Sequence, residues 1–150
     1  MMGDYSDERV LQVLNLTNEV VTAVMGVDGV GPISMLREIG AIKTFFNRAR
    51  QTYADSPLIQ AMLRMSESEA YAQEGTKTTA VDAEDVLTRV GGIDVLVDDP
   101  AEAVLLKRFL YELAAEVANA SGPGWFGSGE RMSAQEKIFL ERLKTQLGLA

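Results

Sequence analysis

The chain has 150 residues, of which 47% are hydrophobic and 24% charged, with a formal net charge of −8 and neither cysteine nor histidine. The missing residue types exclude thiolate nucleophiles, Cys/His zinc sites, haem ligation by histidine and every Ser–His catalytic triad. The acidic balance argues against nucleic-acid binding, because DNA and RNA are held mainly by Lys and Arg on phosphates. The length predicts a single domain, residues 1–150, with a core of its own.

No apolar run reaches the ~18–20 residues of a membrane-spanning helix. The N-terminal stretch MMGDYSDERV has no basic region followed by an apolar core, so it predicts no secretory signal. We therefore expect a cytoplasmic protein without a membrane span. The groups that remain for chemistry are carboxylates, hydroxyls, Lys, Arg and the backbone. The oxygen ligands among them suit Ca²⁺, Mg²⁺ or Mn²⁺.

Apolar periodicity predicts three helices in the first half. Ser6 and two following acids start a helix of about residues 7–25, which the turn sequence GVDGVGP ends. Ser34 is predicted to cap a second helix that runs to about residue 54. Its buried stripe is expected to hold Met35, Leu36, Ile39, Ile42, Phe46, Ala49 and Tyr53. Ser56 and Pro57 then start a third helix, which is expected to reach about residue 73.

The second half predicts two long helices and a short one. The short helix begins near Asp82 and stops at Gly91-Gly92, and the following IDVLV is either a helical turn or an extended connector. In DPAE, Asp99 is predicted as the N-cap and Glu102 as the closing residue of a capping box, before a helix to about residue 120. SAQE, residues 133–136, predicts a second capping box, and Gly148 is a good C′ residue. The expected fold is an all-α bundle of about six or seven helices.

Two segments of the chain share one layout. In VMGVDGVGPISMLREIGAI and in VANASGPGWFGSGERMSAQEKIFL, a helix rich in Val and Ala ends in a glycine-containing loop. An apolar residue, a serine and a helix with an early glutamate follow in both. The layout suggests two related helix–loop–helix halves and hence a pseudo-symmetric bundle, although common capping signals alone also produce such likeness.

The glycine-rich stretch at 119–130 does not predict a nucleotide or calcium loop. It contains GxGxxG at residues 122–127, but no strand precedes and no helix follows at once, as a dinucleotide fold requires. Read as a calcium loop, its twelve positions hold only one carboxylate. Trp125 and Phe126 either fold over the bundle as an apolar plug, the interpretation we favour, or form an exposed anchor for a partner protein.

Several acids lie where loops become helices. Helix capping and the helix dipole account for Asp99, Glu102 and Glu136. Asp28 lies in the first loop and Glu38 early in the next helix, and capping explains these two less well because Ser34 already caps. If the two halves pack face to face, the acids of both loops, together with Asp98 and Asp99, converge on one cation.

The DG-containing loop, the early glutamate and their repetition in an acidic all-α chain resemble the tellurite-resistance TerB-like family. The most similar part is LYELAAEVANASG…GERMSAQEKIFLERLKTQLGL, and the resemblance extends over most of the chain. It implies a pseudo-symmetric bundle of about seven helices that binds a divalent metal through clustered acids in bacterial stress responses, without a known catalytic activity. By position it implies Asp28, Glu38 and Glu136 as metal ligands. The chain departs from the pattern at Ser121, where the second half would have Asp before its Gly.

Three hypotheses follow. The first is a non-enzymatic cytoplasmic protein that binds Ca²⁺, Mg²⁺ or Mn²⁺ near Asp28, Glu38 and Glu136. The second is a metal-free module that binds other proteins through Trp125 and Phe126 or through grooves between helices. The third is an enzyme acting through carboxylates alone, which the absence of a recognisable carboxylate pair disfavours.

Overall fold

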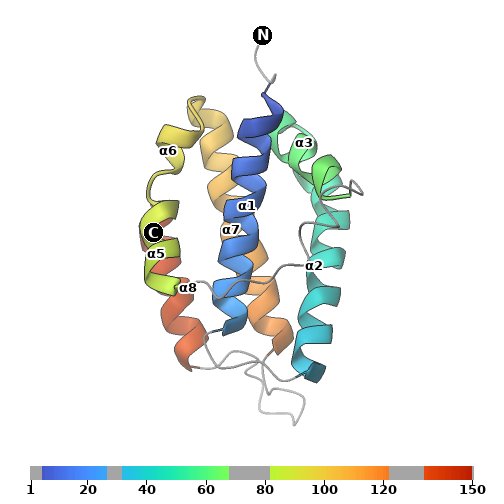
Figure 1. The fold of residues 1–150 in the computed structure, drawn as a ribbon, viewed down its shortest axis with the longest axis vertical. Coiled ribbons are helices and arrows are strands. Elements are labelled where there is room, and N and C mark those ends of the chain that lie inside the picture. Colours follow the sequence, from blue (N-terminus) through green and yellow to red (C-terminus); the bar gives the residue numbers. More distant parts are fainter. Residues whose placement is uncertain (1–4, 27–31, 68–81, 122–133, 150) are drawn as a thin grey trace.

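The computed structural model in Figure 1 describes residues 5–26, 32–67, 82–121 and 134–149, apart from the side chains of residues 25, 26, 32–39, 120 and 121. In these ranges the chain forms seven helices and no strand, which confirms the predicted all-α bundle. The helices are α1 (Asp7–Gly26), α2 (Pro32–Thr52), α3 (Pro57–Ser66), α5 (Ala83–Val90), α6 (Ile93–Leu96), α7 (Pro100–Ser121) and α8 (Ala134–Leu147). None of the helices in these ranges has the length and apolar character needed to cross a bilayer.

Helix α7 is the centre of the bundle. It packs against α1, α2, α6 and α8, and its most extensive contact is with α2. Its apolar residues recur every three or four positions over more than one face, so neighbouring helices cover it from several sides. Its buried apolar side chains are those of Ala103, Leu106, Phe109, Leu110, Leu113, Ala114, Val117 and Ala118.

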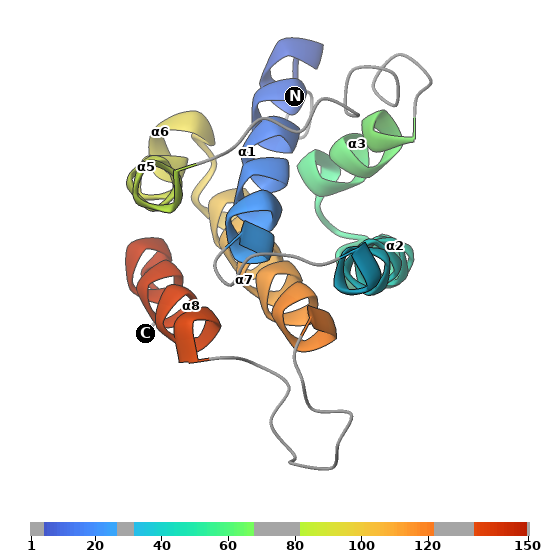
Figure 2. The same cartoon turned by 60° about the horizontal axis from the view of Figure 1, so that its bottom comes forward.

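The consecutive helices α1 and α2 are arranged in the same way as the consecutive helices α7 and α8. Helices α1 and α7 lie side by side and both end at the lower end of the view in Figure 1, where α2 and α8 begin, and Figure 2 shows the same arrangement with this end turned forward. We call this the loop end of the bundle. The two pairs share this layout but not their packing, because α7 packs against α8 whereas α1 packs mainly against α7, α3 and α5.

Two predicted helix boundaries differ from the structure. Helix α2 begins at Pro32, so Ser34 lies inside its first turn and is not the N-cap. The fixed φ of proline suits the first position of a helix, which explains the earlier start. Helix α3 ends at Ser66, where the amide of the C-cap residue Glu67 donates to the carbonyl of Arg64 at 3.2 Å, and the rest of the predicted helix lies outside the described residues. IDVLV forms the single turn α6, the first of the two predicted alternatives.

The predicted start of the short helix near Asp82 and the predicted cap roles of Asp99 and Gly148 are confirmed. The Asp82 carboxylate accepts from the amide of Glu84 at 3.1 Å at the start of α5, and that of Asp99 accepts from the amide of Ala101 at 3.1 Å. Gly148 has φ 72°, the left-handed conformation expected after the last turn of α8. The second predicted capping box begins at Ser133, which lies outside the described residues.

Glu102 does not close a capping box with Asp99. It is 5% exposed, and its Oε1 accepts from the Ser56 hydroxyl at 3.1 Å and from the Leu58 amide at 2.9 Å. The Ser56 hydroxyl oxygen in turn accepts from the Ile59 amide at 3.1 Å. Since Pro57 has no amide hydrogen, the first free amides of α3 are all satisfied, one of them by a side chain from α7. Glu102 therefore caps a helix that precedes it by more than 40 residues.

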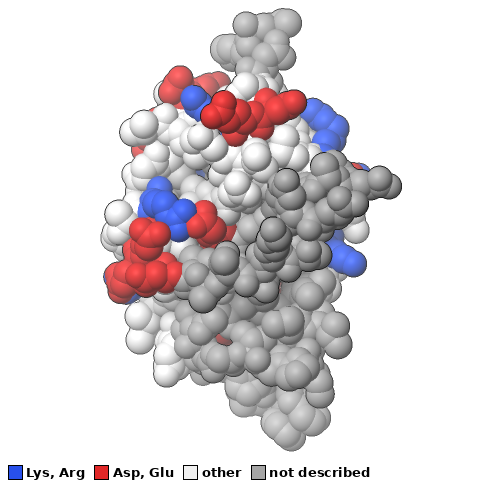
Figure 3. All heavy atoms as spheres, viewed as in Figure 1, with Lys and Arg blue, Asp and Glu red and all other residues white. Residues whose placement is uncertain are grey.

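Ion pairs link α5 to its two neighbours, α1 and α8, and acidic and basic side chains lie next to one another over α5 in Figure 3. The two oxygens of Glu84 accept from both terminal nitrogens of Arg142 on α8, at 2.5 and 2.6 Å. On the other side, Arg89 pairs with Glu19 of α1 and with Asp85 at 3.0 Å. The hydrogen bond from Arg142 lowers the pKa of the Glu84 carboxyl below its ordinary value of 4.5.

This lowered pKa predicts a pH-dependent contribution to stability. A carboxyl whose pKa falls on folding stabilises the fold above its unfolded pKa, and the stabilisation is lost as the pH falls through the folded value. We expect Glu84→Gln to melt at a lower temperature than wild type at neutral pH, and the difference to close below pH 4.5. Thermal unfolding between neutral and acid pH measures this difference. Glu141→Gln is the matched control, and an equal loss in that variant would contradict a specific role for the Glu84–Arg142 pair.

Candidate functional site

The loop end is the first candidate site, because the predicted metal ligands belong to it. Glu136 lies in the first turn of α8 and is buried, with 2% of its surface exposed. Glu38 lies in the second turn of α2, but its side chain is outside the described residues, as is the whole of Asp28. Trp125 and Phe126 also lie outside them, so their predicted role in partner binding stays a prediction.

Two acids considered for the same cluster are far from it. Asp98 and Asp99 precede the first turn of α7, whereas Glu136 follows the connection from the last turn of that helix. The 22 residues of α7 separate the two ends by roughly 33 Å at 1.5 Å per residue. Asp98 and Asp99 are therefore not ligands in a common site with Glu136. Among the described residues no three acidic side chains are grouped in a way that could hold a metal ion.

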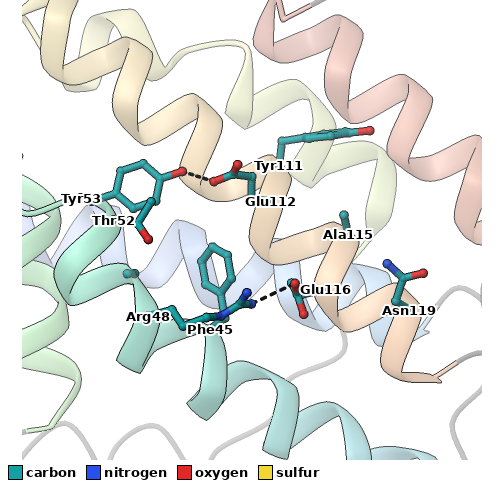
Figure 4. Close-up of a pocket in the computed structure, with 10 residues that line it drawn as sticks. Phe45, Arg48, Thr52, Tyr53, Tyr111, Glu112, Ala115, Glu116 and Asn119 are labelled. Atoms are coloured by element: carbon teal, nitrogen blue, oxygen red, sulfur yellow. Dashed lines mark hydrogen bonds and ion pairs between the residues drawn. The ribbon is translucent and has the colours of Figure 1, made fainter.

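The second candidate site is a groove between α2 and α7, which we call the α2–α7 groove (Figure 4). It encloses about 300 Å³, at the small end of the range for ligand pockets in proteins. The lining residues are Phe45, Arg48, Ala49 and Thr52 from α2, Tyr53 from the turn that follows it, and Tyr111, Glu112, Ala115, Glu116 and Asn119 from α7. Its floor is aromatic, and its rim is polar and charged.

Phe109 of α7 supports the floor of the α2–α7 groove. Its ring centroid lies 5.3 Å from that of Phe45 and 5.5 Å from that of Tyr53, both in edge-to-face geometry. Phe45 and Tyr53 are buried, so the groove has a rigid apolar base. The predicted stripe of α2 contained Tyr53 and Phe46 but not Phe45, whereas Phe45 is buried and Phe46 is half-buried.

Two polar bridges cross the α2–α7 groove (Figure 4). The Tyr53 hydroxyl donates to Oε1 of Glu112, and Nη2 of Arg48 lies 2.9 Å from Oε1 of Glu116. The Arg48 guanidinium also lies over the Phe45 ring, 5.8 Å from its centroid. The side chain of Arg48 is 56% exposed, so its ion pair with Glu116 lies at the rim of the groove.

Burial and the hydrogen bond to Glu112 raise the pKa of the Tyr53 hydroxyl far above its ordinary value of 10.0. Tyr53 therefore stays a neutral hydrogen-bond donor throughout the physiological range. A general base needs a pKa near the working pH, and a raised tyrosine pKa is the opposite of that requirement. Tyr53 is accordingly a fixed hydrogen-bond donor in the groove and not a candidate general base.

No family model, curated protein or solved structure matches this chain. The resemblance to the TerB-like family thus stays a prediction from the sequence. Two places in the described part of the chain have the features of a functional site. The loop end contains the buried Glu136, and the α2–α7 groove is lined by Glu112 and Glu116.

Proposed function

We propose that this chain is a non-enzymatic cytoplasmic TerB-like helical protein that binds a divalent cation at the loop end, in a stress-response role like that of the tellurite-resistance family. Asp28, Glu38 and Glu136 are the proposed ligands. The all-α fold with seven described helices agrees with the fold class and helix content that the resemblance implies.

The burial of Glu136 is the observation that carries the proposal. Most helix-start acids are exposed to water, where they interact with the helix dipole at little cost. Glu136 is 2% exposed and has at least one interaction within the chain, so its carboxylate is held in a fixed, largely dehydrated position at the start of α8. A low-dielectric surrounding also strengthens the attraction between a carboxylate and a divalent cation.

The chemistry of the proposed ligands fits a hard cation. Carboxylate oxygens suit Ca²⁺, Mg²⁺ and Mn²⁺, and the chain has neither the thiolates nor the imidazoles that softer metals prefer. The cation would supply positive charge that joins the start of α8 to the connection between α1 and α2. Such a link is structural or regulatory, in keeping with the proposed absence of catalysis.

Thermal unfolding of EDTA-stripped protein with and without each of the three ions tests the proposal. A ligand present at 100 times its Kd adds about 2.7 kcal/mol to the free energy of unfolding, which raises the midpoint of a chain of this size by roughly 5–10 °C. We expect at least one ion to raise the midpoint, and we expect Asp28→Asn, Glu38→Gln and Glu136→Gln each to abolish the shift.

Asp94→Asn is the matched control, because Asp94 is an exposed carboxylate on α6, away from the loop end. This variant removes the same charge and should keep the full ion-dependent shift. The absence of any shift in wild type, with all three ions at millimolar concentration, would refute the proposed cation site.

A further inference from the structure

The residues that line the α2–α7 groove carry two negative charges and one positive charge, and Arg108 adds a second guanidinium near the Tyr53 hydroxyl. Glu112 and Glu116 project from one face of α7, one turn apart, and Arg48 is the single charged residue that lines the groove from α2. Glu116 pairs with Arg48, whereas Glu112 accepts only from the neutral hydroxyl of Tyr53. Within the described residues, one carboxylate of the groove therefore has no cation within ion-pair distance.

Cations already lie over the aromatic rings of this groove. Arg48 lies over Phe45 while it pairs with Glu116, and Nζ of Lys144 on α8 lies 6.0 Å from the centroid of the Tyr111 ring. The negative face of an aromatic ring attracts such groups, and a nearby carboxylate adds to the attraction. Arg48 thus shows, within the chain itself, how a guanidinium binds here: stacked on an aromatic ring and paired with a carboxylate of α7.

The second carboxylate, Glu112, has the half-buried ring of Tyr111 beside it, whereas the ring of Tyr53 is buried beneath the groove. Glu112 lies between the rings of Tyr53 and Tyr111, and its Oε2 makes no hydrogen bond within the described part of the chain (Figure 4). A guanidinium suits this place better than an ammonium, because its planar fork can stack on a ring and donate to a carboxylate at once. The aliphatic stem of an arginine would cover the apolar floor.

We propose that the α2–α7 groove binds an arginine side chain from a basic segment of a partner protein, with Glu112 as its main carboxylate. The volume of about 300 Å³ is small and suits one side chain held in place by a larger surface. The net charge of −8 favours the approach of a basic partner, since complementary charge raises association rates. Arg48 competes with the incoming arginine for Glu116.

Titration calorimetry with the probe peptide acetyl-Gly-Ala-Arg-Ala-Gly-amide tests this inference. Its control is the same peptide with citrulline, which keeps the shape of arginine and lacks its charge. We expect the arginine peptide to bind with a Kd below about 1 mM and the citrulline peptide to bind at least tenfold more weakly, a factor that corresponds to ~1.4 kcal/mol. Equal binding of the two peptides, or no binding of either, would overturn the proposal.

Three variants locate the site. Glu112→Gln should weaken the arginine peptide about tenfold, because it removes the charge and keeps an acceptor for Tyr53. Glu141→Gln on α8 makes the same change of net charge outside the groove and should leave the Kd unchanged. Arg48→Gln should strengthen binding, because it frees Glu116 from its internal partner. Equal effects of Glu112→Gln and Glu141→Gln, or weaker binding by Arg48→Gln, would refute the groove as the site.

Titration with free arginine distinguishes a small-molecule ligand from an arginine within a segment of a partner protein. If free arginine binds as tightly as the peptide, the ligand is a small molecule and the inferred protein partner is wrong. We expect the peptide to bind more tightly, because its flanking backbone adds contacts with the polar rim, to which Thr52 and Asn119 belong. Circular dichroism of each variant verifies that it is folded before its affinity is compared.

Discussion

Replacing Phe109 by alanine should lower the free energy of unfolding by about 3–5 kcal/mol, the usual cost of removing a buried aromatic ring. Phe109 is fully buried in the central helix, and its ring contacts those of Phe45, Phe46 and Tyr53 at centroid distances of 5.3, 6.1 and 5.5 Å. The variant loses the apolar transfer energy, the edge-to-face contacts and the support that the ring gives to α2. Urea unfolding at neutral pH measures the loss.

A matched control for this variant is Val104→Ala on the same helix. Val104 is 47% exposed, so the change should stay within about 0.5 kcal/mol of wild type. Alanine has a higher helix propensity than phenylalanine or valine, so propensity favours both variants. The difference between the two variants therefore reports the effect of burial. A loss below about 1 kcal/mol in Phe109→Ala would contradict the packing of α2 on α7, since cavities of this size cost more in a well-packed core.

The order and type of the helices were predictable because the responsible signals are local. Asp82 and Asp99 cap the helices that directly follow them, and Gly148 takes the left-handed conformation expected of a C′ residue. Apolar spacing of three and four residues likewise predicted the long stripes of α1 and α7. Such features depend on a few neighbouring residues, so the sequence shows them directly.

The groove was not predictable, since it depends on which helices become neighbours. Tyr53 and Glu112 are 59 positions apart, and no local pattern marks them as partners. Arg48 has the ordinary spacing of an exposed residue, and only the packing of α2 on α7 brings it to Glu116. Phe45 was missed for the same reason, because the width of a buried stripe is determined by the helices that cover it.

Glu102 has the spacing of a helix-start residue of α7, but its carboxylate caps a different helix, α3. The spacing of Asp99 and Glu102 fits a capping box, yet the carboxylate of Glu102 extends to the start of α3. Both arrangements satisfy amides at a helix start, and tertiary packing decides between them. The same ambiguity applies to Glu136, whose burial is known from the structure but could not be inferred from its place in SAQE.

We expect Glu102→Ala to lower the free energy of unfolding by about 3 kcal/mol, because hydrogen bonds to a charged acceptor and the burial of unsatisfied donors each cost on the order of 1–3 kcal/mol. The change leaves the Ser56 hydroxyl and the Leu58 amide without their acceptor, in a place where Glu102 is only 5% exposed. Urea unfolding measures the total loss. Hydrogen exchange should also quicken at the Leu58 amide, which locates the damage at the start of α3.

Two further variants separate the cap of α3 from the cap of α7. Asp99→Ala removes the acceptor for the Ala101 amide and should cost about 1 kcal/mol, the ordinary value for an N-cap. Glu102→Gln keeps an oxygen that can accept from Leu58, so its loss should be smaller than that of Glu102→Ala. If Glu102→Ala costs no more than Asp99→Ala and leaves exchange at Leu58 unchanged, Glu102 does not cap α3. If the expected order holds, a carboxylate of the central helix determines where α3 begins, directly after the turn that contains Tyr53.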